Sequence, residues 1–407
     1  MGNLTNTDAA FIARKLGFAA SPGLLNEIFA IADKKTAILH LLQQSSDLTD
    51  LPEWHDLMPQ DIERDKDTVN QMKQELWQWW HRQMVETRTP FNEVMVLFWH
   101  NHFVSSVKKV KWAPTMLAQN QLFRKHGTGS FRALLDGIIH DAAMLIYLDN
   151  DDNKKSAPNE NLARELLELF TLGEGNYTEQ DIKELARALT GATVSKKTGR
   201  YVFRKRIHDK GEKTIFGQTG KFGPDDIADL ILAQPECARF VVQKLWHYFT
   251  ESPLMDEELN ELADLFTESD FHLQPVLEHI FLSDAFWASA GTQIKSPVHL
   301  MIGCQRLIGF HENSAKQFRR FAKGMGQLLF MPPNVKGWPG GAAWYSSSYI
   351  PERERFSKLV NRELRNHPDL SLINRYLLSV TPMTDITNEN DKTVLKLTLL
   401  DPAFQVV

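Results

Sequence analysis

NEVMVLFWHNHFVSS, at residues 92–106, has the length of a helix and is apolar on every side from Val94 to Trp99. A helix that is hydrophobic all round is buried in the interior of a protein. We therefore expect this segment to lie at the centre of the molecule, with Val96, Phe98 and Trp99 shielded from solvent. A core built around such a segment is helical.

Helix signals continue on both sides of this segment. Ser21 before Pro22, Ser130 and Thr178 have the form of helix N-caps. Within residues 61–86, apolar side chains recur four apart on one face, namely at Met72, Leu76, Trp80 and Met84. Helical periods return further along, at residues 225–250, 256–268, 274–283, 297–310 and 351–365. The pattern predicts a mainly α protein, a compact multi-helix globular array.

Two segments depart from the helical pattern. In residues 192–217, Tyr201 and Phe203 alternate with polar neighbours, and turn signals occur at Thr198–Gly199 and Lys210–Gly211. This predicts one small inserted β-hairpin or meander. Residues 330–350 are rich in Pro, Gly and Ser, so no regular element is expected there. Loops of this length are often functional.

The β insertion divides the chain into an N-terminal helical half (1–191) and a C-terminal helical half (218–407). We expect the halves to pack together as one structural unit. Composition agrees with a globular protein, since 43% of the 407 residues are hydrophobic and 24% are charged. The two cysteines, Cys237 and Cys304, lie far apart among apolar residues and are expected to be buried free thiols.

The formal net charge is −5, so the chain lacks the overall basic excess that nucleic-acid binding uses. The short basic runs, of which Lys196–Lys197 and Arg204–Arg206 are examples, are interpreted as solvated faces, and no nucleic-acid partner is expected. No window approaches about 18 apolar residues, so no membrane helix is predicted. The first residues do not have the pattern of a signal peptide, which favours a cytoplasmic protein; the alternative is an exported protein whose leader is not part of this sequence.

The first polar constellation is His100, Asn101 and His102, at the end of the apolar helix. Buried polar groups need partners, or each costs about 1–3 kcal/mol. Residues two apart on a helix point to different sides, so the two histidines cannot easily chelate one ion. They are either hydrogen-bonded core histidines, or one of them belongs to a metal site. The metal remains unknown, and no motif requires a cofactor.

The second constellation is the predicted helix NENLARELLELFTLG, residues 159–173. Asn159 is expected to cap it, and Glu160 and Arg164 lie four apart on one flank. Glu165 and Glu168 lie on the other flank, beside the core stripe of Leu162, Leu166, Leu169 and Phe170. Paired carboxylates at a core edge can serve as acid and base. The alternative is a capped helix with flanking ion pairs to Arg164 or Arg187.

Two further groups follow along the chain. Arg187 with Glu184 precedes His208–Asp209, where Asp209 either orients the imidazole or starts a turn before Gly211. In the irregular loop, Trp338, Trp344 and Tyr345 either form an exposed stacking platform for a sugar or partner, or attach the loop to the core. No GxxxxGK[ST], GxGxxG, HExxH or GxSxG motif is present, so the common nucleotide, zinc-protease and serine-hydrolase sites lose support.

Together these segments resemble a bacterial family, the domain-of-unknown-function family 1800. The motifs that carry the resemblance are FWHNHF (98–103), YLDN (147–150), NENLARELLELFTLGEGNYTEQDIKELARALTG (159–191), HDKG (208–211) and PPNVKGWPGG (332–341). One departure is Ala192, where the family often has Trp. The resemblance implies a bacterial origin, and a possible partner, a sulfatase- or phosphatase-like protein from a neighbouring gene. It implies no reaction. The signature residues matched here are His100, Asn101, His102, Asp149, Asn159, Glu160, Arg164, Glu165, Glu168, Arg187, His208, Asp209 and Trp338.

Two functions remain open. The favoured hypothesis is a non-catalytic binding or assembly protein, whose polar cluster is a buried ion-pair network. The alternative is a hydrolase or lyase acting on a glycan-like substrate, with Glu160, Glu165 or Glu168 as acid or base. In that case His100 or His102 assists, Arg187 holds an anion, and Trp338 and Trp344 stack a sugar. A sealed cluster favours the first hypothesis and a concave pocket the second. We also expect the Glu165 carboxylate to bond Arg187 or one of the two histidines.

Overall fold

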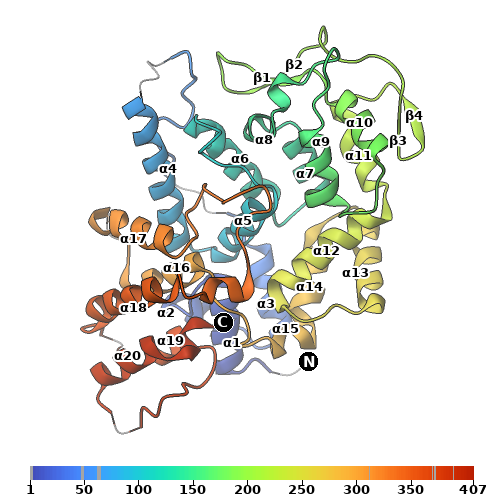
Figure 1. The fold of residues 1–407 in the computed structure, drawn as a ribbon. Helices are drawn as coiled ribbons and strands as arrows, with labels where there is room; N and C mark the ends of the chain where they lie inside the picture. The colour runs from blue at the N-terminus through green and yellow to red at the C-terminus, as the bar shows by residue number, and fades with distance from the viewer. Residues whose placement is uncertain are drawn as a thin grey trace.

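The computed structural model describes residues 3–46, 50–61, 66–310, 312–368, 370, 373–387 and 389–407, and most of them are helical (Figure 1). The mainly α prediction is confirmed. The helices before the β insertion are α1 (Asn6–Gly17), α2 (Pro22–Phe29), α3 (Lys34–Gln43), α4 (Lys66–Glu86), α5 (Pro90–His102), α6 (Ala113–His126), α7 (Phe131–Ile139), α8 (Ala142–Tyr147), η1 (Asn150–Asp152), α9 (Asn161–Glu165), η2 (Leu166–Thr171) and α10 (Glu179–Ala188).

Helices follow the insertion as well. They are η3 (Pro224–Asp226), α11 (Ile227–Leu232), α12 (Pro235–Thr250), α13 (Asp256–Glu268), α14 (Leu273–Leu282), α15 (Asp284–Ala288), α16 (Pro297–Ile308), α17 (Glu312–Gly324), η4 (Gly341–Tyr345), α18 (Ile350–Leu364), α19 (Ile373–Leu377), α20 (Asp391–Leu400) and η6 (Pro402–Gln405). The periodicity at 225–250 becomes two helices, because Pro235 lacks an N–H and begins a new helix. Residues 62–65 of the predicted 61–86 helix lie outside the described residues.

Helix α5 lies near the centre of the molecule, as its apolar sequence predicts (Figure 1). Val96 is 1%, Phe98 6% and Trp99 0% exposed. Pro90 occupies the first turn, where its missing N–H costs nothing. Helices α1, α4 and α6 pack around α5, and the Trp99 indole N–H donates to the Gly127 carbonyl at 2.7 Å. The burial of this helix is confirmed.

The predicted helix at 159–172 is only partly correct. It begins as α9 and continues as a π-helix, η2. The backbone N–H of Leu172 donates to the Leu167 carbonyl five residues back, at 2.9 Å, and the Thr171 hydroxyl reaches the Leu166 carbonyl at 2.5 Å. The wider turn changes the directions of the side chains that follow it. Single turns of π-helix often mark functional sites.

The β insertion consists of two separate antiparallel hairpins. Strand β1 (Ala192–Val194) pairs with β2 (Tyr201–Phe203), and β3 (Lys213–Ile215) pairs with β4 (Gln218–Gly220). The second hairpin therefore extends beyond the predicted boundary at 217. Its two-residue turn has positive φ at Phe216 and Gly217 (48° and 76°), which suits the right-handed twist of short hairpins. A small β element in a helical protein is confirmed.

Helices from either side of the insertion pack against each other. Helix α16 contacts α4, α11 contacts α7, and α19 contacts α1. Among the described residues, no helix is both long and apolar enough to cross a membrane. Cys237 and Cys304 are buried free thiols, as expected. The division of the chain into two halves stays a prediction.

Candidate functional site

A pocket of about 410 Å³ opens beside the C-terminal half of α5. Its wall is completed by α1, by the second half of α12, by residues 293–299 and by the loop that contains Trp338 and Trp344. Small-molecule sites have volumes of about 300–1,000 Å³ and mostly apolar walls. The aromatic residues of this wall are Phe98, Tyr248, Phe249, Trp338 and Trp344. Its size and lining therefore suit a small organic ligand.

Four lysines line the pocket against a single acidic side chain among the described residues. They come from four segments of the chain, as Lys15, Lys244, Lys295 and Lys336, and the acidic side chain is that of Glu251. Like charges gathered in a low-dielectric cleft repel one another unless an anion joins them. The pocket is therefore electropositive inside a protein whose net charge is −5.

Two of these lysines are almost fully buried, with Lys15 3% and Lys295 5% exposed. Burial lowers the pKa of Lys15 to about 7, against the opposing effect of Glu251. Burial also lowers the pKa of Lys295 to about 7. The Lys295 ammonium donates to the carbonyls of Leu377 and Phe404 at 3.0 and 2.8 Å, so its role is partly structural.

Lys15 has one hydrogen-bond partner among the described residues, the Gln293 Oε1 atom at 2.5 Å. Gln293 is itself held by the Tyr248 carbonyl, to which its amide donates at 2.9 Å. A lysine ammonium carries three donors. Lys15 therefore keeps donors for a ligand.

Two other wall residues carry buried polar atoms without a hydrogen-bond partner in the described part of the chain. These atoms are Nε2 of His299 and Nε1 of Trp338. Burial, followed by the charges of Lys295 and Lys15, lowers the pKa of His299 to about 3, so the ring is neutral. The ring bonds the Arg14 backbone, which leaves Nε2 as an acceptor. Both atoms expose almost no surface, so they lie within the wall rather than on the face that a ligand would contact.

Asn101 attaches to α5 the irregular loop that contains Trp338 and Trp344, here called the tryptophan loop. Its Oδ1 atom accepts the backbone N–H of Trp338 at 2.7 Å. The preceding Gly337 has φ of 82°, and a Cβ there would lie 2.4 Å from Asn101 Oδ1 and 2.6 Å from its carbonyl oxygen. Only glycine fits such a close approach at positive φ. The contact between Asn101 and Gly337 therefore fixes one wall of the pocket.

His100 and His102 point in different directions, as their spacing predicts. His102 lines the pocket, and its Nε2 donates to the carbonyl of Phe170 in the π-helix at 2.9 Å. His100 packs in the core against the rings of Trp80 and Phe330, at 5.2 and 5.3 Å between centroids. Burial lowers the pKa of each to about 3. No group of three His, Cys, Asp or Glu side chains in the described residues is arranged to hold a metal ion.

The sequence model of a family described as a protein of unknown function, DUF1800, matches residues 12–405. The chain belongs to the DUF1800 family. No curated protein and no solved structure matches it significantly. In this DUF1800 protein, the FWHNHF and PPNVKGWPGG motifs meet at Asn101 and Gly337 and together form one wall of the pocket.

The glutamates of the long DUF1800 motif lie outside the pocket lining, to which their helix contributes only Leu169. Glu160 pairs with Arg164 at 3.3 Å, and Arg164 forms a two-pronged pair with Glu179 at 2.8 and 2.9 Å. Glu168 accepts the Tyr177 hydroxyl at 3.3 Å. These contacts agree with the alternative of flanking ion pairs.

Our expectation for Glu165 is wrong. Its half-buried carboxylate forms no hydrogen bond or ion pair with the described residues. Arg187 is engaged elsewhere, and His102 donates to a backbone carbonyl. Burial raises the pKa of Glu165, and the nearby charge of Glu168 adds to this effect, while Lys336 opposes it.

Asp149 and Asn159 organise the entrance to α9. Asp149 has φ of 59° and pairs with Lys109 at 2.6 Å. The Asn159 Oδ1 atom accepts the N–H of Asn161 at 3.0 Å, although the N-cap residue of α9 is Glu160 rather than the predicted Asn159. The sequence did not reveal Asn153, whose buried side chain accepts the N–H of Asn159 and donates to the Ala186 carbonyl.

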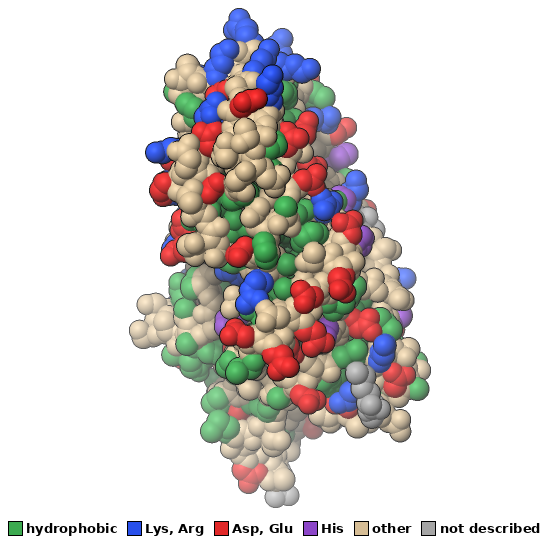
Figure 2. Space-filling model, turned by 90° about the vertical axis from the view of Figure 1, so that its right-hand side faces the viewer, with side chains coloured by type: hydrophobic (Ala, Val, Ile, Leu, Met, Phe, Trp, Pro, Cys, Tyr) green, Lys and Arg blue, Asp and Glu red, His purple; other side chains and the backbone are tan. Residues whose placement is uncertain are grey.

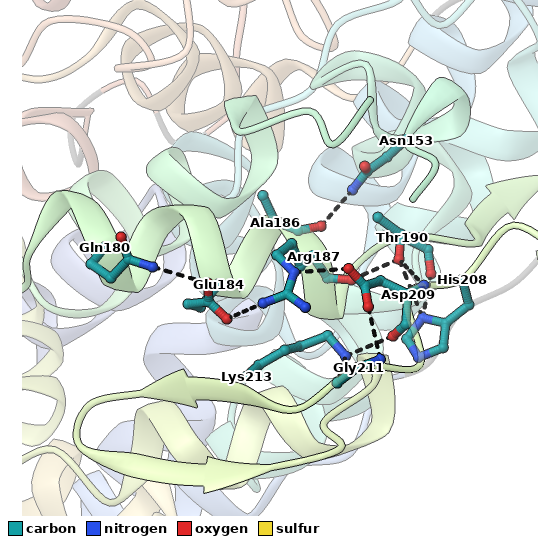
Figure 3. A network of polar contacts seen from close by, with 10 residues as sticks. All are labelled: Asn153, Gln180, Glu184, Ala186, Arg187, Thr190, His208, Asp209, Gly211 and Lys213. Carbon is teal, nitrogen blue, oxygen red and sulfur yellow. Dashed lines mark hydrogen bonds and ion pairs between the residues drawn. The ribbon is translucent and has the colours of Figure 1, made fainter. Parts of the chain in front are cut away.

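Arg187 lies in a second polar cluster, between α10 and the chain that leads into β3 (Figure 3). It pairs with Glu184 at 2.5 Å and with Asp209 at 2.8 Å. Asp209 also accepts the N–H of Gly211 at 2.8 Å, which is the predicted turn. His208 donates from Nδ1 to the Thr190 carbonyl at 2.8 Å rather than to Asp209. The cluster attaches the β insertion to α10.

The tryptophans of the loop are not an exposed platform. Trp338 and Trp344 are each 4% exposed, whereas Tyr345 is exposed. They attach the loop to the core and line the pocket at the same time. The sequence analysis did not identify the pocket lysines. The one available signal was a lysine within an apolar run, such as Lys15 in FIARKLGF.

The two buried lysines predict how stability changes with pH. The folded-state pKa of each, about 7, lies below the ordinary lysine pKa of 10.5. Between these values the unfolded chain binds more protons, so the free energy of unfolding rises with pH in this window. The penalty for charging a buried amine is fully present below pH 7. We expect Lys15→Met to remove part of this dependence.

Urea denaturation of the wild type and of Lys15→Met, followed from below pH 7 to above pH 9, measures this effect. The wild type should gain stability relative to the variant as pH rises. Lys392→Met, at an exposed lysine, serves as the control and should keep the wild-type dependence. A difference between wild type and Lys15→Met that does not change with pH would contradict the assignment.

Proposed function

We propose that this protein is a non-catalytic binding protein, and that the pocket beside α5 holds a small organic anion. The observation that carries the proposal is the set of four lysines around one carboxylate on an aromatic wall. A ligand carboxylate, sulfate or phosphate would pair with the ammonium groups of this lining. Lys15 can direct its remaining donors to that group.

The aromatic residues of the pocket lining narrow the ligand class. Aromatic walls suit the C–H faces of sugar rings. We therefore propose a hydroxylated anion, of the kind represented by a sugar acid or a sulfated or phosphorylated sugar.

The hydrolase or lyase alternative has less support. It depends on Glu160, Glu165 or Glu168 as acid and base, and none of the three is a lining residue of the pocket. Arg187, the proposed anion holder, is neutralised by Glu184 and Asp209. Our proposal shares with that alternative a sugar-like ligand but includes no reaction.

Calorimetric titration with galacturonate and with glucose 6-phosphate tests the proposal, with glucose as the uncharged comparison. Either anion should bind at least about tenfold more tightly than glucose, a difference of about 1.4 kcal/mol. Lys15→Met should weaken anion binding by about tenfold or more, and Lys392→Met should leave it unchanged. Binding should also weaken from pH 6 to pH 8.5, because free Lys15 loses its proton with a pKa of about 7.

Equal binding of glucose and the anions would contradict the proposal, as would an unaltered affinity in Lys15→Met. Turnover of a sugar substrate that survives in Lys15→Met but is lost in Glu165→Gln would favour the hydrolase or lyase instead. Each variant's melting curve shows whether the fold is retained.

A further inference from the structure

The first hairpin carries a concentration of positive charge. Residues 192–211 contain seven Lys or Arg and one Asp, a local net charge of +6 (7 − 1), against −5 for the whole chain. All seven are exposed, and the first six are here called the hairpin cations, namely Lys196, Lys197, Arg200, Arg204, Lys205 and Arg206. Figure 2 shows Lys and Arg gathered at one end of the molecule, the end where Figure 1 places β1 and β2.

A second segment adds to this charge. The backbone N–H of Lys155 donates to the Ile207 carbonyl at 2.8 Å, so the exposed Lys154 and Lys155 lie beside the last hairpin cations. The acidic neighbours on the other side are Asp151 and Asp152 of η1, which contacts β1. The end of the molecule thus remains strongly basic.

The hairpin cations are not used by the fold. None of the six forms an ion pair with another described residue. Asp209, the one acid in the segment, is held by Arg187 at 2.8 Å. Unpaired like charges concentrated on a short hairpin repel one another, and a polyanion relieves this repulsion while releasing its counterions.

The surroundings of the hairpin cations narrow the class of polyanion. Single-stranded nucleic acids use exposed aromatic rings for stacking, but Tyr201 and Phe203 of β2 pack on His140 and His208, at 4.9 and 5.1 Å between centroids. Membrane insertion needs exposed apolar side chains. The exposed large hydrophobic residues described lie outside this segment, at Met255, Tyr345, Ile350, Val380, Met383 and Leu400.

The basic surface is confined to one end of the molecule, which argues against a membrane or a nucleic-acid duplex as the partner. In Figure 2, Asp and Glu side chains spread over the face below the basic end. A membrane or a nucleic-acid duplex lying along the molecule would bring its charge close to these acids, which is unfavourable. A thin chain can contact the end alone.

We propose that the hairpin cations bind a linear acidic polysaccharide, through its repeated carboxylate or sulfate groups. This site is separate from the pocket beside α5 and rests on different residues. The contacts are mainly electrostatic, so binding falls steeply with salt. The pocket could remain empty without affecting this interaction.

Fluorescence anisotropy with labelled alginate and labelled heparin tests the proposal on the full chain, with neutral dextran as the comparison. At least one acidic polysaccharide should bind at about 50 mM salt and weaken by about tenfold or more at about 200 mM. The variant R204Q/K205Q/R206Q should weaken binding by about tenfold or more, and K196Q/K197Q should weaken it as well. The matched control K323Q/K392Q/K396Q removes three exposed lysines elsewhere and should bind like the wild type.

Several outcomes would overturn the proposal. Binding to dextran as tightly as to the acidic chains would show that the interaction is not electrostatic. An equal loss of polysaccharide binding in the control variant would show that the hairpin cations are not the binding site. Tighter binding of a DNA duplex or of vesicles with anionic lipid, at the same salt, would assign the surface to that partner instead. Melting curves confirm that the variants fold.

Discussion

Arg124→Met is expected to lower the free energy of unfolding by about 3–5 kcal/mol, because it leaves the carboxylate of Glu93 buried without its partner. Arg124 on α6 and Glu93 on α5 form a two-pronged pair, with Nη2 and Oε2 at 2.8 Å. The two side chains are 4% and 3% exposed. The Trp80 indole N–H donates to the same Glu93 oxygen at 2.9 Å, but a neutral donor does not replace a charge.

The double variant Glu93→Met with Arg124→Met separates the lost charge balance from the lost packing. Replacing both partners of a buried pair by apolar side chains is often neutral or stabilising. We therefore expect the double variant to be more stable than Arg124→Met alone. Arg164→Met provides the comparison at a partly exposed pair, where the loss should be within about 1 kcal/mol.

Urea denaturation at constant pH measures all three variants. A loss below about 1 kcal/mol in Arg124→Met would mean that water reaches Glu93 and that the pair is not a buried one. A double variant as unstable as the single one would indicate that packing of the arginine stem, rather than charge, dominates. The sequence analysis expected a buried ion-pair network among the signature residues, whereas this buried pair joins α5 and α6 through Glu93 and Arg124, which are not among them.

Much of the fold could be predicted because the apolar residues that are buried recur in the sequence at helical spacing. Helix α5 is apolar all round and is buried, and Thr178 with Asp181 forms the predicted capping box of α10. The π-helix was not predictable, because a five-residue hydrogen-bond step needs no special residue type. Its consequence is seen at Leu169, which belongs to the predicted core stripe but lines the pocket instead.

The candidate site was predicted only in part. Asn101, His102, Trp338 and Trp344 line the pocket, and their functional roles stay predictions. They could be singled out because polar groups beside an apolar helix and aromatics in an irregular loop mark unusual positions. The pocket lysines come from segments far apart in the chain, and only the tertiary packing brings them together. Helical periodicity gives the flank on which a glutamate lies but not what faces that flank, which is why Glu165 was misplaced.

Gly337→Ala is expected to abolish ligand binding in the pocket, because the tryptophan loop can no longer approach α5. An alanine at φ of 82° costs about 1–3 kcal/mol through backbone strain alone. Its Cβ would also meet Asn101 Oδ1 at 2.4 Å and the Asn101 carbonyl oxygen at 2.6 Å. The loop must therefore move, and Trp338 moves with it because it follows Gly337 directly. This movement breaks the hydrogen bond from the Trp338 backbone N–H to Asn101.

Gly340→Ala is the matched control, because Gly340 lines the same pocket but a Cβ there meets nothing within 4 Å. Calorimetry with galacturonate and thermal unfolding should show loss in Gly337→Ala and near wild-type behaviour in Gly340→Ala. Asn101→Ala added to Gly337→Ala removes the side-chain clash but keeps the carbonyl one, so it should not restore binding. Rescue by Asn101→Ala would show that the clash with the Asn101 side chain alone displaces the loop. Equal behaviour of the two glycine variants would show that the loop does not form the pocket wall.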